Sequence, residues 1–200
     1  LDADLDQTQD NRLGIAHAAE MAKEYLLSKE AFLLSGKING AATAKGAAHN
    51  EKFAKHLSAM GEPHETFDAK QMREITGSSY YTDGLFTPGT AMIQPAMYIR
   101  GVANGLRQEG VTIYEDSPVT ALNNNGSWVV ETPQGQVSSP RIILAVNGHL
   151  NSFGYAKSRL MHVFTYASMT RALTPKEIVR LGGRKVWGLT SADPVGTTVR

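Results

Sequence analysis

The segment 141–146 constrains the fold most, because it is an apolar run in which polar residues do not alternate. A strand with one face in water alternates apolar and polar side chains, so the run Ile142-Ile143-Leu144-Ala145-Val146 is typical of a strand that is covered on both faces. The run is far shorter than the ~20 apolar residues that a membrane-spanning helix needs. It therefore predicts an interior sheet strand and no membrane segment.

Helices are indicated by runs of helix-forming residues with capping signals at their ends. Asp68 with Gln71 forms a capping signature, Pro95 and Gly110 bracket a helix with one apolar stripe, and Thr174-Pro175 is a typical helix start. The predicted helices cover residues 11–30, 49–60, 68–76 and 95–109, and a further helix begins at 174.

Short strands are predicted between turn signals, with residues 84–88 as a loop. Asn123-Asn124-Asn125-Gly126 and Pro133-Gln134-Gly135 are typical hairpin turns, because Asn and Gly adopt a positive φ at low cost. The strand that follows Gly110 would complete half of a βαβ crossover. The predicted strands cover residues 31–34, 111–114, 119–122, 127–132, 136–138, 141–146 and 161–169.

Composition excludes several classes of protein. The 200 residues carry 20 Lys and Arg against 19 Asp and Glu, a net charge of +1, which argues against a nucleic-acid partner. The absence of cysteine removes disulfides, thiolate nucleophiles and Cys-based zinc sites. A chain without disulfides and without a visible signal peptide is expected in the cytoplasm.

No metal site is predicted. Asp2, Asp4 and Asp6 alternate as in a calcium loop, but Gln7 stands where that loop needs glycine. His49 and His56 share a helix face but lie about 10.5 Å apart along the axis, too far to bind one zinc ion.

The exit of the 141–146 segment is the candidate ligand site. Open α/β sheets bind ligands at the carboxyl ends of their parallel strands. Here that end carries Ala145, Asn147 and Gly148, small or turn-forming residues that let a ligand approach the backbone. The alternative is that Asn147-Gly148 is only a turn that leaves a strand.

The ordered set of motifs from 30 to 173 resembles the FAD-dependent amino-acid and amine oxidoreductases of the D-amino-acid-oxidase superfamily, which includes glycine and sarcosine oxidases. The matching stretches include Tyr80-Tyr81-Thr82-Asp83-Gly84-Leu85, Gln94-Pro95, Ser117-Pro118-Val119, Val130-Glu131-Thr132-Pro133-Gln134-Gly135 and Ile142-Ile143-Leu144-Ala145-Val146-Asn147-Gly148. Met161-His162-Val163-Phe164 and Thr170-Arg171-Ala172-Leu173 resemble the strand that opens that family's substrate-domain sheet.

This resemblance implies an α+β fold in which helices pack on a mixed sheet. An incomplete FAD-binding α/β lobe would cover residues 96–159, and part of a substrate-domain sheet would cover 1–95 with 160–200. The Val119 backbone would meet the adenine end of FAD. Ala145 and Asn147, followed by Gly148, would lie near the adenosine and pyrophosphate.

The resemblance also implies a reaction. Enzymes of this superfamily transfer a hydride from the carbon that bears an amine to flavin N5, and the resulting imine hydrolyses. The substrate would be a small amine or amino acid. The catalytic residues are not assigned, although Arg159, Arg171 and His162 are residue types that could bind a substrate carboxylate.

Two departures from the family pattern leave other functions open. The dinucleotide fingerprint G-x-G-x-x-G and the glycine-rich segment that covers the flavin are both absent. The chain is therefore interpreted as an internal portion of such an enzyme. The alternatives are a non-enzymatic small-molecule-binding α/β domain and an interaction module.

The isolated 200-residue chain is expected to be inactive and flavin-free, because the pyrophosphate-binding fingerprint is missing. It is also expected to self-associate through unpaired sheet edges and exposed apolar faces. Absorbance spectroscopy and size-exclusion chromatography with light scattering check both expectations. A stoichiometric flavin band or a clean monomer at high concentration would contradict them.

Overall fold

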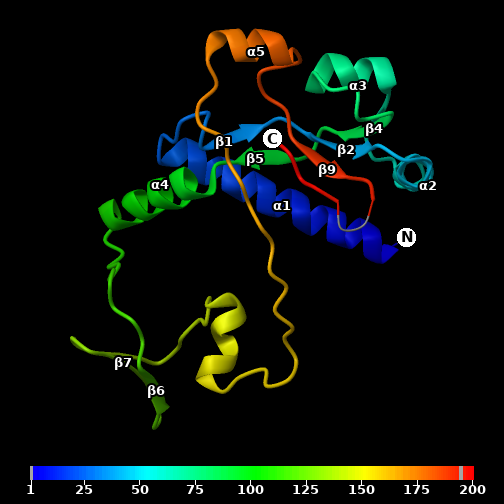
Figure 1. The fold of residues 1–200 in the computed structure, drawn as a ribbon. Helices are drawn as coiled ribbons and strands as arrows, with labels where there is room; N and C mark the ends of the chain where they lie inside the picture. Colours follow the sequence, from blue (N-terminus) through cyan, green and yellow to red (C-terminus); the bar gives the residue numbers. More distant parts are fainter. Residues whose placement is uncertain (1, 194–195) are drawn as a thin grey trace. The chain divides into compact units, whose positions relative to one another are not determined.

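The computed structural model describes residues 2–193 and 196–200, which divide into two compact units (Figure 1). The first unit joins Leu1–Val111 to Ala172–Arg200, and the second is the continuous stretch Thr112–Arg171. The predicted domains, 1–95 with 160–200 and 96–159, likewise join the two ends of the chain. Their assignment as substrate-domain and FAD-binding portions stays a prediction.

A four-stranded mixed sheet forms the centre of the first unit, in the order β3 (Glu65–Asp68), β4 (Asp83–Thr87), β2 (Lys37–Ala41) and β9 (Leu189–Ser191). Strand β2 pairs antiparallel with β4 and parallel with β9. A separate two-stranded sheet pairs β1 (Phe32–Leu34) with β5 (Ala91–Ile93). This mixed sheet, with helices packed on it, confirms the predicted α+β fold class.

The core lies between this sheet and α3 (Ala69–Thr76). Its buried cluster comprises Ile38, Phe67, Met72, Ile75 and Leu189. Met72 and Ile75 are the buried residues of α3, and they share one face of that short amphipathic helix. The core thus joins segments from both ends of the chain.

Capping signals placed three of the helices correctly. Asp68 and Gln71 form a capping box at the start of α3, and Thr174 and Glu177 form another at the start of α5 (Pro175–Leu181). Helix α4 (Pro95–Gln108) begins at its proline as predicted. These signals act within one turn of backbone, so the sequence alone reveals them.

Two helices begin earlier than predicted. Helix α1 (Asp2–Glu24) starts well before residue 11 and ends at Glu24 rather than at 30. Helix α2 (Ala44–Ala59) starts at Ala44 rather than 49. The Thr43 hydroxyl caps α2 by accepting a hydrogen bond from the Gly46 amide. The small residues before His49 were therefore the first turns of the helix.

The second unit contains the predicted meander. Strands β6 (Ala121–Asn124), β7 (Trp128–Thr132) and β8 (Gly135–Ser139) pair antiparallel in sequence order. Gly126 and Gly135 have φ values of 94° and 157°, which explains why these two turns contain glycine. A 3₁₀ helix, η1 (Asn147–Phe153), follows.

The prediction of an interior strand at 141–146 is wrong for this chain. These residues are irregular, and Ile143 is 93% exposed. A strand covered on both faces needs neighbouring strands and covering helices. Among the described residues no strand pairs with this run, so no neighbouring strand covers its apolar side chains here.

The predicted strands at 111–114 and 161–169 are also absent, and with them the βαβ crossover. Residues 161–169 are extended but unpaired, and Tyr166 is 99% exposed. A local pattern shows a preference for the extended state, whereas a strand also needs a hydrogen-bonded neighbour.

The loop predicted at 84–88 is instead strand β4, which has neighbours on both sides. Gly84 was a misleading turn signal. A Cβ atom at this position would lie 2.3 Å from the Met72 sulfur, so the glycine permits close packing of α3 on the sheet. Strands β2, β3, β5 and β9 were not predicted at all.

None of the helices among the described residues is both long and apolar enough to cross a bilayer.

A buried asparagine links α2 to the central sheet. Asn50 is 2% exposed, and its Nδ2 donates to the Asn39 carbonyl oxygen at 3.0 Å and to Asp83 Oδ1 at 2.6 Å. The amide thus connects one helix with two strands, β2 and β4.

Asn50→Ala is expected to lower the free energy of unfolding by about 1–3 kcal/mol, because it removes both bonds and leaves the buried Asn39 carbonyl without this donor. The matched control is His49→Ala, at the exposed neighbouring position on α2. Chemical denaturation measures both variants. Equal stability of the two variants would contradict a structural role for the Asn50 amide.

Candidate functional site

The four residues predicted to bind FAD all lie in the second unit. Val119 immediately precedes the meander, where the Thr120 amide donates to the Glu131 carbonyl oxygen at 2.8 Å. Val119 is 38% exposed. Its own amide has no hydrogen-bond partner among the described residues, so this donor is available to a ligand.

Asn147 and Gly148 are the first two residues of η1, and Ala145 lies two residues before it. Asn147 has a φ of 49°, in the left-handed region that Asn tolerates better than most residues. Its conformation turns the chain directly after the apolar run. Ala145 and Asn147 are both exposed.

Gly148 closes this turn against His162. The His162 Nε2 atom is 3.0 Å from the Gly148 carbonyl oxygen, and this oxygen can only accept, so Nε2 carries the donated proton. A Cβ atom at Gly148 would lie 2.7 Å from the same nitrogen. Only glycine therefore lets the ring approach this closely without moving.

The structure brings three of the four predicted residues together, as the sequence order requires. No hydrogen bond joins Val119 to Ala145, Asn147 or Gly148 within residues 2–193 and 196–200. The family resemblance implies that Val119 and the turn at 145–148 contact the same nucleotide, and the structure neither confirms nor contradicts this.

Three of the four residues, Val119, Ala145 and Asn147, are exposed. They present an unpaired backbone amide, small side chains and a 3₁₀ helix whose start has no side-chain cap. None of them carries a group that could perform proton transfer or redox chemistry. Any redox chemistry would therefore have to come from a cofactor.

The three candidates for binding a substrate carboxylate all lie in the second unit. The His162 ring is engaged with Gly148, and Arg159 and Arg171 are both exposed. Among the described residues, no group of three His, Cys, Asp or Glu side chains could hold a metal ion.

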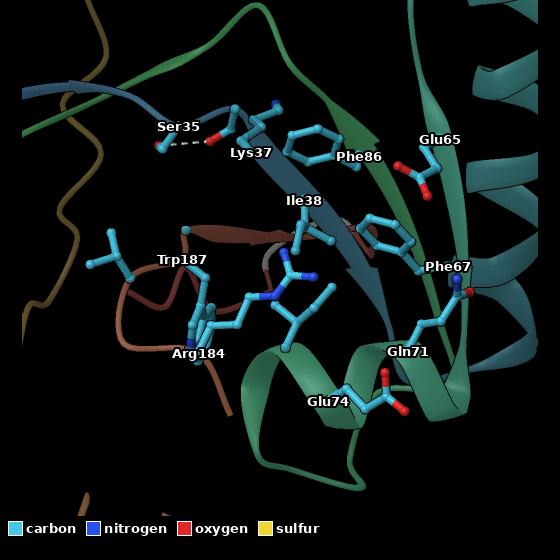
Figure 2. A pocket seen from close by; sticks show the side chains of 14 residues that line it. Ser35, Lys37, Ile38, Glu65, Phe67, Gln71, Glu74, Phe86, Arg184 and Trp187 are labelled. Carbon is cyan, nitrogen blue, oxygen red and sulfur yellow. Dashed lines mark hydrogen bonds between the residues drawn. The ribbon is translucent and has the colours of Figure 1, made fainter. Parts of the chain in front are cut away.

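Sequence reasoning missed a cavity of about 270 Å³ in the first unit (Figure 2). It lies between α3, the sheet and the segment 184–188, and its lining includes Ile38, Glu65, Phe67, Glu74, Phe86, Arg184 and Trp187. These residues come from four separate stretches of the chain. No local motif joins them, so no sequence signal marked the cavity.

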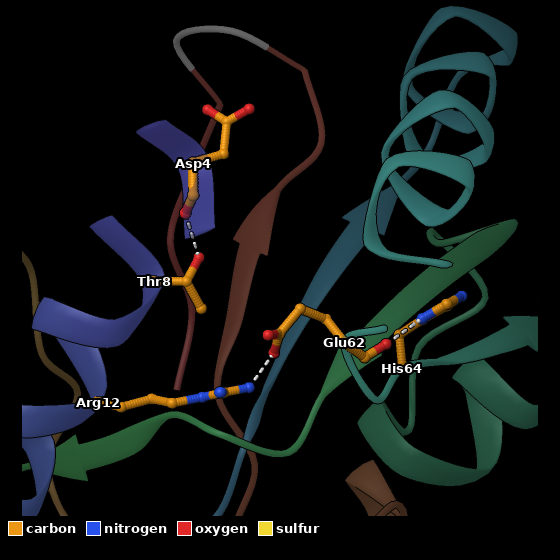
Figure 3. Close-up of polar contacts among 5 residues, drawn as sticks. All are labelled: Asp4, Thr8, Arg12, Glu62 and His64. Carbon is orange, nitrogen blue, oxygen red and sulfur yellow. Dashed lines mark hydrogen bonds and ion pairs between the residues drawn. The ribbon is translucent and has the colours of Figure 1, made fainter. Parts of the chain in front are cut away.

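A second hollow of about 580 Å³ lies beside α1. Arg12 on α1 forms an ion pair there with Glu62, which follows α2 (Figure 3). The Glu62 carbonyl oxygen is 2.8 Å from the Nδ1 atom of His64. The ion pair connects the N-terminal helix to the loop before β3. Its two charged groups therefore have a structural role.

The hydroxyls of Tyr81 and Tyr98, both in the first unit, have raised pKa values and remain protonated at neutral pH. Burial raises the pKa of Tyr81, and the neighbouring Tyr80 raises it further. Burial also raises the pKa of Tyr98, whose hydroxyl donates to the Ala18 carbonyl oxygen at 2.9 Å. These phenols can therefore donate hydrogen bonds but cannot act as bases.

Known proteins resemble this chain in sequence. The probable oxidoreductase OrdL of Rhizobium meliloti is 26% identical over 178 residues, which cover 84% of this chain and 42% of the relative. The mitochondrial dimethylglycine dehydrogenase of Rattus norvegicus is 38% identical over 84 residues, 41% of this chain and 9% of the relative.

Solved structures resemble its fold. Glycine oxidase from Geobacillus kaustophilus has a TM-score of 0.59 at 18% identity, over 69% of this chain and 38% of that one. L-amino acid deaminase from Proteus myxofaciens also reaches 0.59, at 16% identity, over 72% of this chain and 34% of that one.

The match to a protein family is more extensive. The chain spans less than half the length of the relatives named above. Residues 6–200, by contrast, match the DAO family, described as FAD dependent oxidoreductase, over nearly all of the chain. The chain therefore belongs to the DAO family of FAD-dependent oxidoreductases.

Proposed function

We propose that the protein containing this chain oxidises the C–N bond of an amino acid or amine with FAD as the acceptor. The family match over residues 6–200 carries this proposal. The substrate class is supported by the printed names of similar proteins, which include glycine oxidase, L-proline dehydrogenase and dimethylglycine dehydrogenase. Each of those names specifies an amino acid or its N-methylated derivative.

The proposed reaction removes two electrons and one proton from the substrate as a hydride that FAD accepts. The hydride leaves the carbon that bears the nitrogen, the nitrogen lone pair forms the C=N bond, and water then hydrolyses the iminium product. The protein's part is to hold that carbon against the flavin and to exclude competing reactions. This chain would contribute to holding the cofactor.

Val119, Ala145, Asn147 and Gly148 are the proposed cofactor contacts. The free Val119 amide and the exposed turn at Ala145 and Asn147 support this assignment, because a nucleotide can approach the backbone there. The remaining contacts to FAD, including the pyrophosphate, would come from parts of the protein outside this sequence.

Cytoplasmic location, self-association of the isolated chain and the lack of a nucleic-acid partner stay predictions. The exposed apolar residues of the 161–169 segment support self-association, since Met161 is 85% and Phe164 is 83% exposed.

The assignment of Val119 predicts the effect of removing its amide. Val119→Pro in the full-length protein deletes the N–H donor and keeps the carbonyl, and it lies outside the β6–β7 pairing. We expect FAD affinity to fall about fivefold, the effect of one hydrogen bond.

Val119→Ala keeps the amide and is the matched control. Flavin fluorescence during titration of the apoprotein measures both variants, and circular dichroism checks the fold. FAD binding to Val119→Pro that is as tight as to Val119→Ala would remove Val119 from the site.

The reaction itself is tested on the full-length flavoprotein without oxygen. L-alanine, L-proline and dimethylglycine are offered in turn, and loss of the long-wavelength flavin absorbance reports hydride transfer. The matched control for alanine is lactate, which has a hydroxyl in place of the amine. Reduction by at least one amine but not by lactate is expected. Reduction by lactate alone would overturn the proposed C–N chemistry.

A further inference from the structure

Asparagine followed by glycine occurs four times in this chain, at Asn39-Gly40, Asn104-Gly105, Asn125-Gly126 and Asn147-Gly148. An asparagine side chain deamidates most easily before glycine, because glycine has no Cβ atom to hinder its own backbone nitrogen. The four pairs are equivalent in this respect. What distinguishes them chemically must therefore come from the structure around each pair.

The deamidation reaction needs only the chain and water. The backbone nitrogen of the glycine loses its proton to the solvent and attacks the Cγ atom of the asparagine side chain. The new C–N bond closes a succinimide ring, the Cγ–Nδ2 bond breaks, and the side-chain nitrogen takes up a proton and leaves as ammonia. Water then opens the ring and gives either aspartate or isoaspartate. The reaction is therefore favoured where the glycine N–H has no hydrogen bond and the asparagine side chain is free to turn toward it.

Two of the pairs are held by secondary structure. Asn39 is 8% exposed, and its Oδ1 accepts a hydrogen bond from the Thr190 hydroxyl at 3.0 Å. The glycine after it lies in β2, between β4 and β9. Asn104 lies inside α4, where the following amide is an intrahelical donor, and its Oδ1 accepts from Arg107 Nη1 at 3.3 Å. Neither pair can react until its strand or helix opens.

The third pair lies in the turn between β6 and β7. The Gly126 amide donates to Asn124 Oδ1 at 3.2 Å, and the Asn125 amide donates to the Ser127 carbonyl oxygen at 3.2 Å. The nitrogen that would attack is therefore already hydrogen-bonded, although Asn125 itself is exposed. Reaction here would first have to break this hydrogen bond.

The fourth pair meets both conditions. Asn147 is exposed, and neither its side chain nor the Gly148 amide has a hydrogen-bond partner within residues 2–193 and 196–200. The amide is free because it lies at the start of η1, whose first bond runs from the His149 amide to the Val146 carbonyl oxygen at 3.1 Å. His162 binds the Gly148 carbonyl oxygen and leaves the amide available.

We propose that Asn147 is the deamidation site of this chain. The product carries a new carboxylate in the turn that follows the apolar run 141–146, and the isoaspartate form also adds a methylene group to the backbone there. The proposal does not depend on the proposed function, because the reaction requires neither a cofactor nor a substrate.

The test follows the whole chain during incubation at mildly alkaline pH, once folded and once in concentrated urea. Mass spectrometry of peptides gives the deamidated fraction at each of the four asparagines. In the folded chain we expect Asn147 to react about fivefold faster than Asn125, the effect of one hydrogen bond. Asn39 and Asn104 should react at least about tenfold more slowly than Asn147, because their amides become available only on local unfolding. In urea the four rates should become similar.

Variants in the β6–β7 turn test whether the hydrogen bond to the glycine amide selects the site. Asn124→Ala removes the acceptor of the Gly126 amide and is expected to raise the rate at Asn125 about fivefold. The matched control is Asn123→Ala, because the Asn123 Nδ2 atom donates to Glu131 Oε1 and not to the turn. The rate at Asn125 should not change in this control.

Three outcomes would count against the proposal. Reaction at Asn125 as fast as at Asn147 in the folded chain would overturn it, and so would the same ratios of the four rates with and without urea. An equal rate at Asn125 in Asn124→Ala and Asn123→Ala would remove the hydrogen-bond argument on which the choice of Asn147 rests.

Discussion

The pairing of β2 with β9 is the contact on which the first unit depends. It aligns Ile38, Asn39 and Gly40 with Leu189, Thr190 and Ser191, so the two ends of the chain share one sheet. The Thr190 hydroxyl donates to Asn39 Oδ1 at 3.0 Å beside this ladder. A Cβ atom at Gly40 would lie 2.5 Å from the Leu189 side chain, so the close packing of Leu189 on β2 requires glycine. Without this pairing the core cluster would lose Leu189, and the 184–188 segment would lose its attachment to β2.

The buried core and the predicted cofactor contacts lie in different units of the chain. The first unit has a buried core and a cavity, whereas the predicted FAD contacts lie in the second unit, near a meander of exposed and half-buried residues. A flavoenzyme of the DAO family needs both cofactor contacts and a substrate-binding surface.

Features that act within a few residues were predictable. The capping boxes at Asp68 and Thr174, the proline at the start of α4 and the glycine-containing turns of the meander all follow from local backbone geometry. Asn147 and Gly148 were recognised as a turn for the same reason, and the structure shows that turn. Features that depend on a distant neighbour were not predictable: Gly84 indicated a loop because the sequence does not show that Met72 packs on it.

The sequence by itself determined the α+β class, the starts of α3, α4 and α5, the hairpins and the order of motifs that indicates the family, because each depends on side-chain type and short-range spacing. Tertiary structure alone decided that 141–146 has no strand partner here, that β2 pairs with β9, and that Arg184, Glu65 and Glu74 line one cavity. The physical reason is that sheet pairing and cavity formation need partners from distant parts of the chain. A local pattern indicates which neighbours a segment needs, and only the folded chain shows whether those neighbours are present.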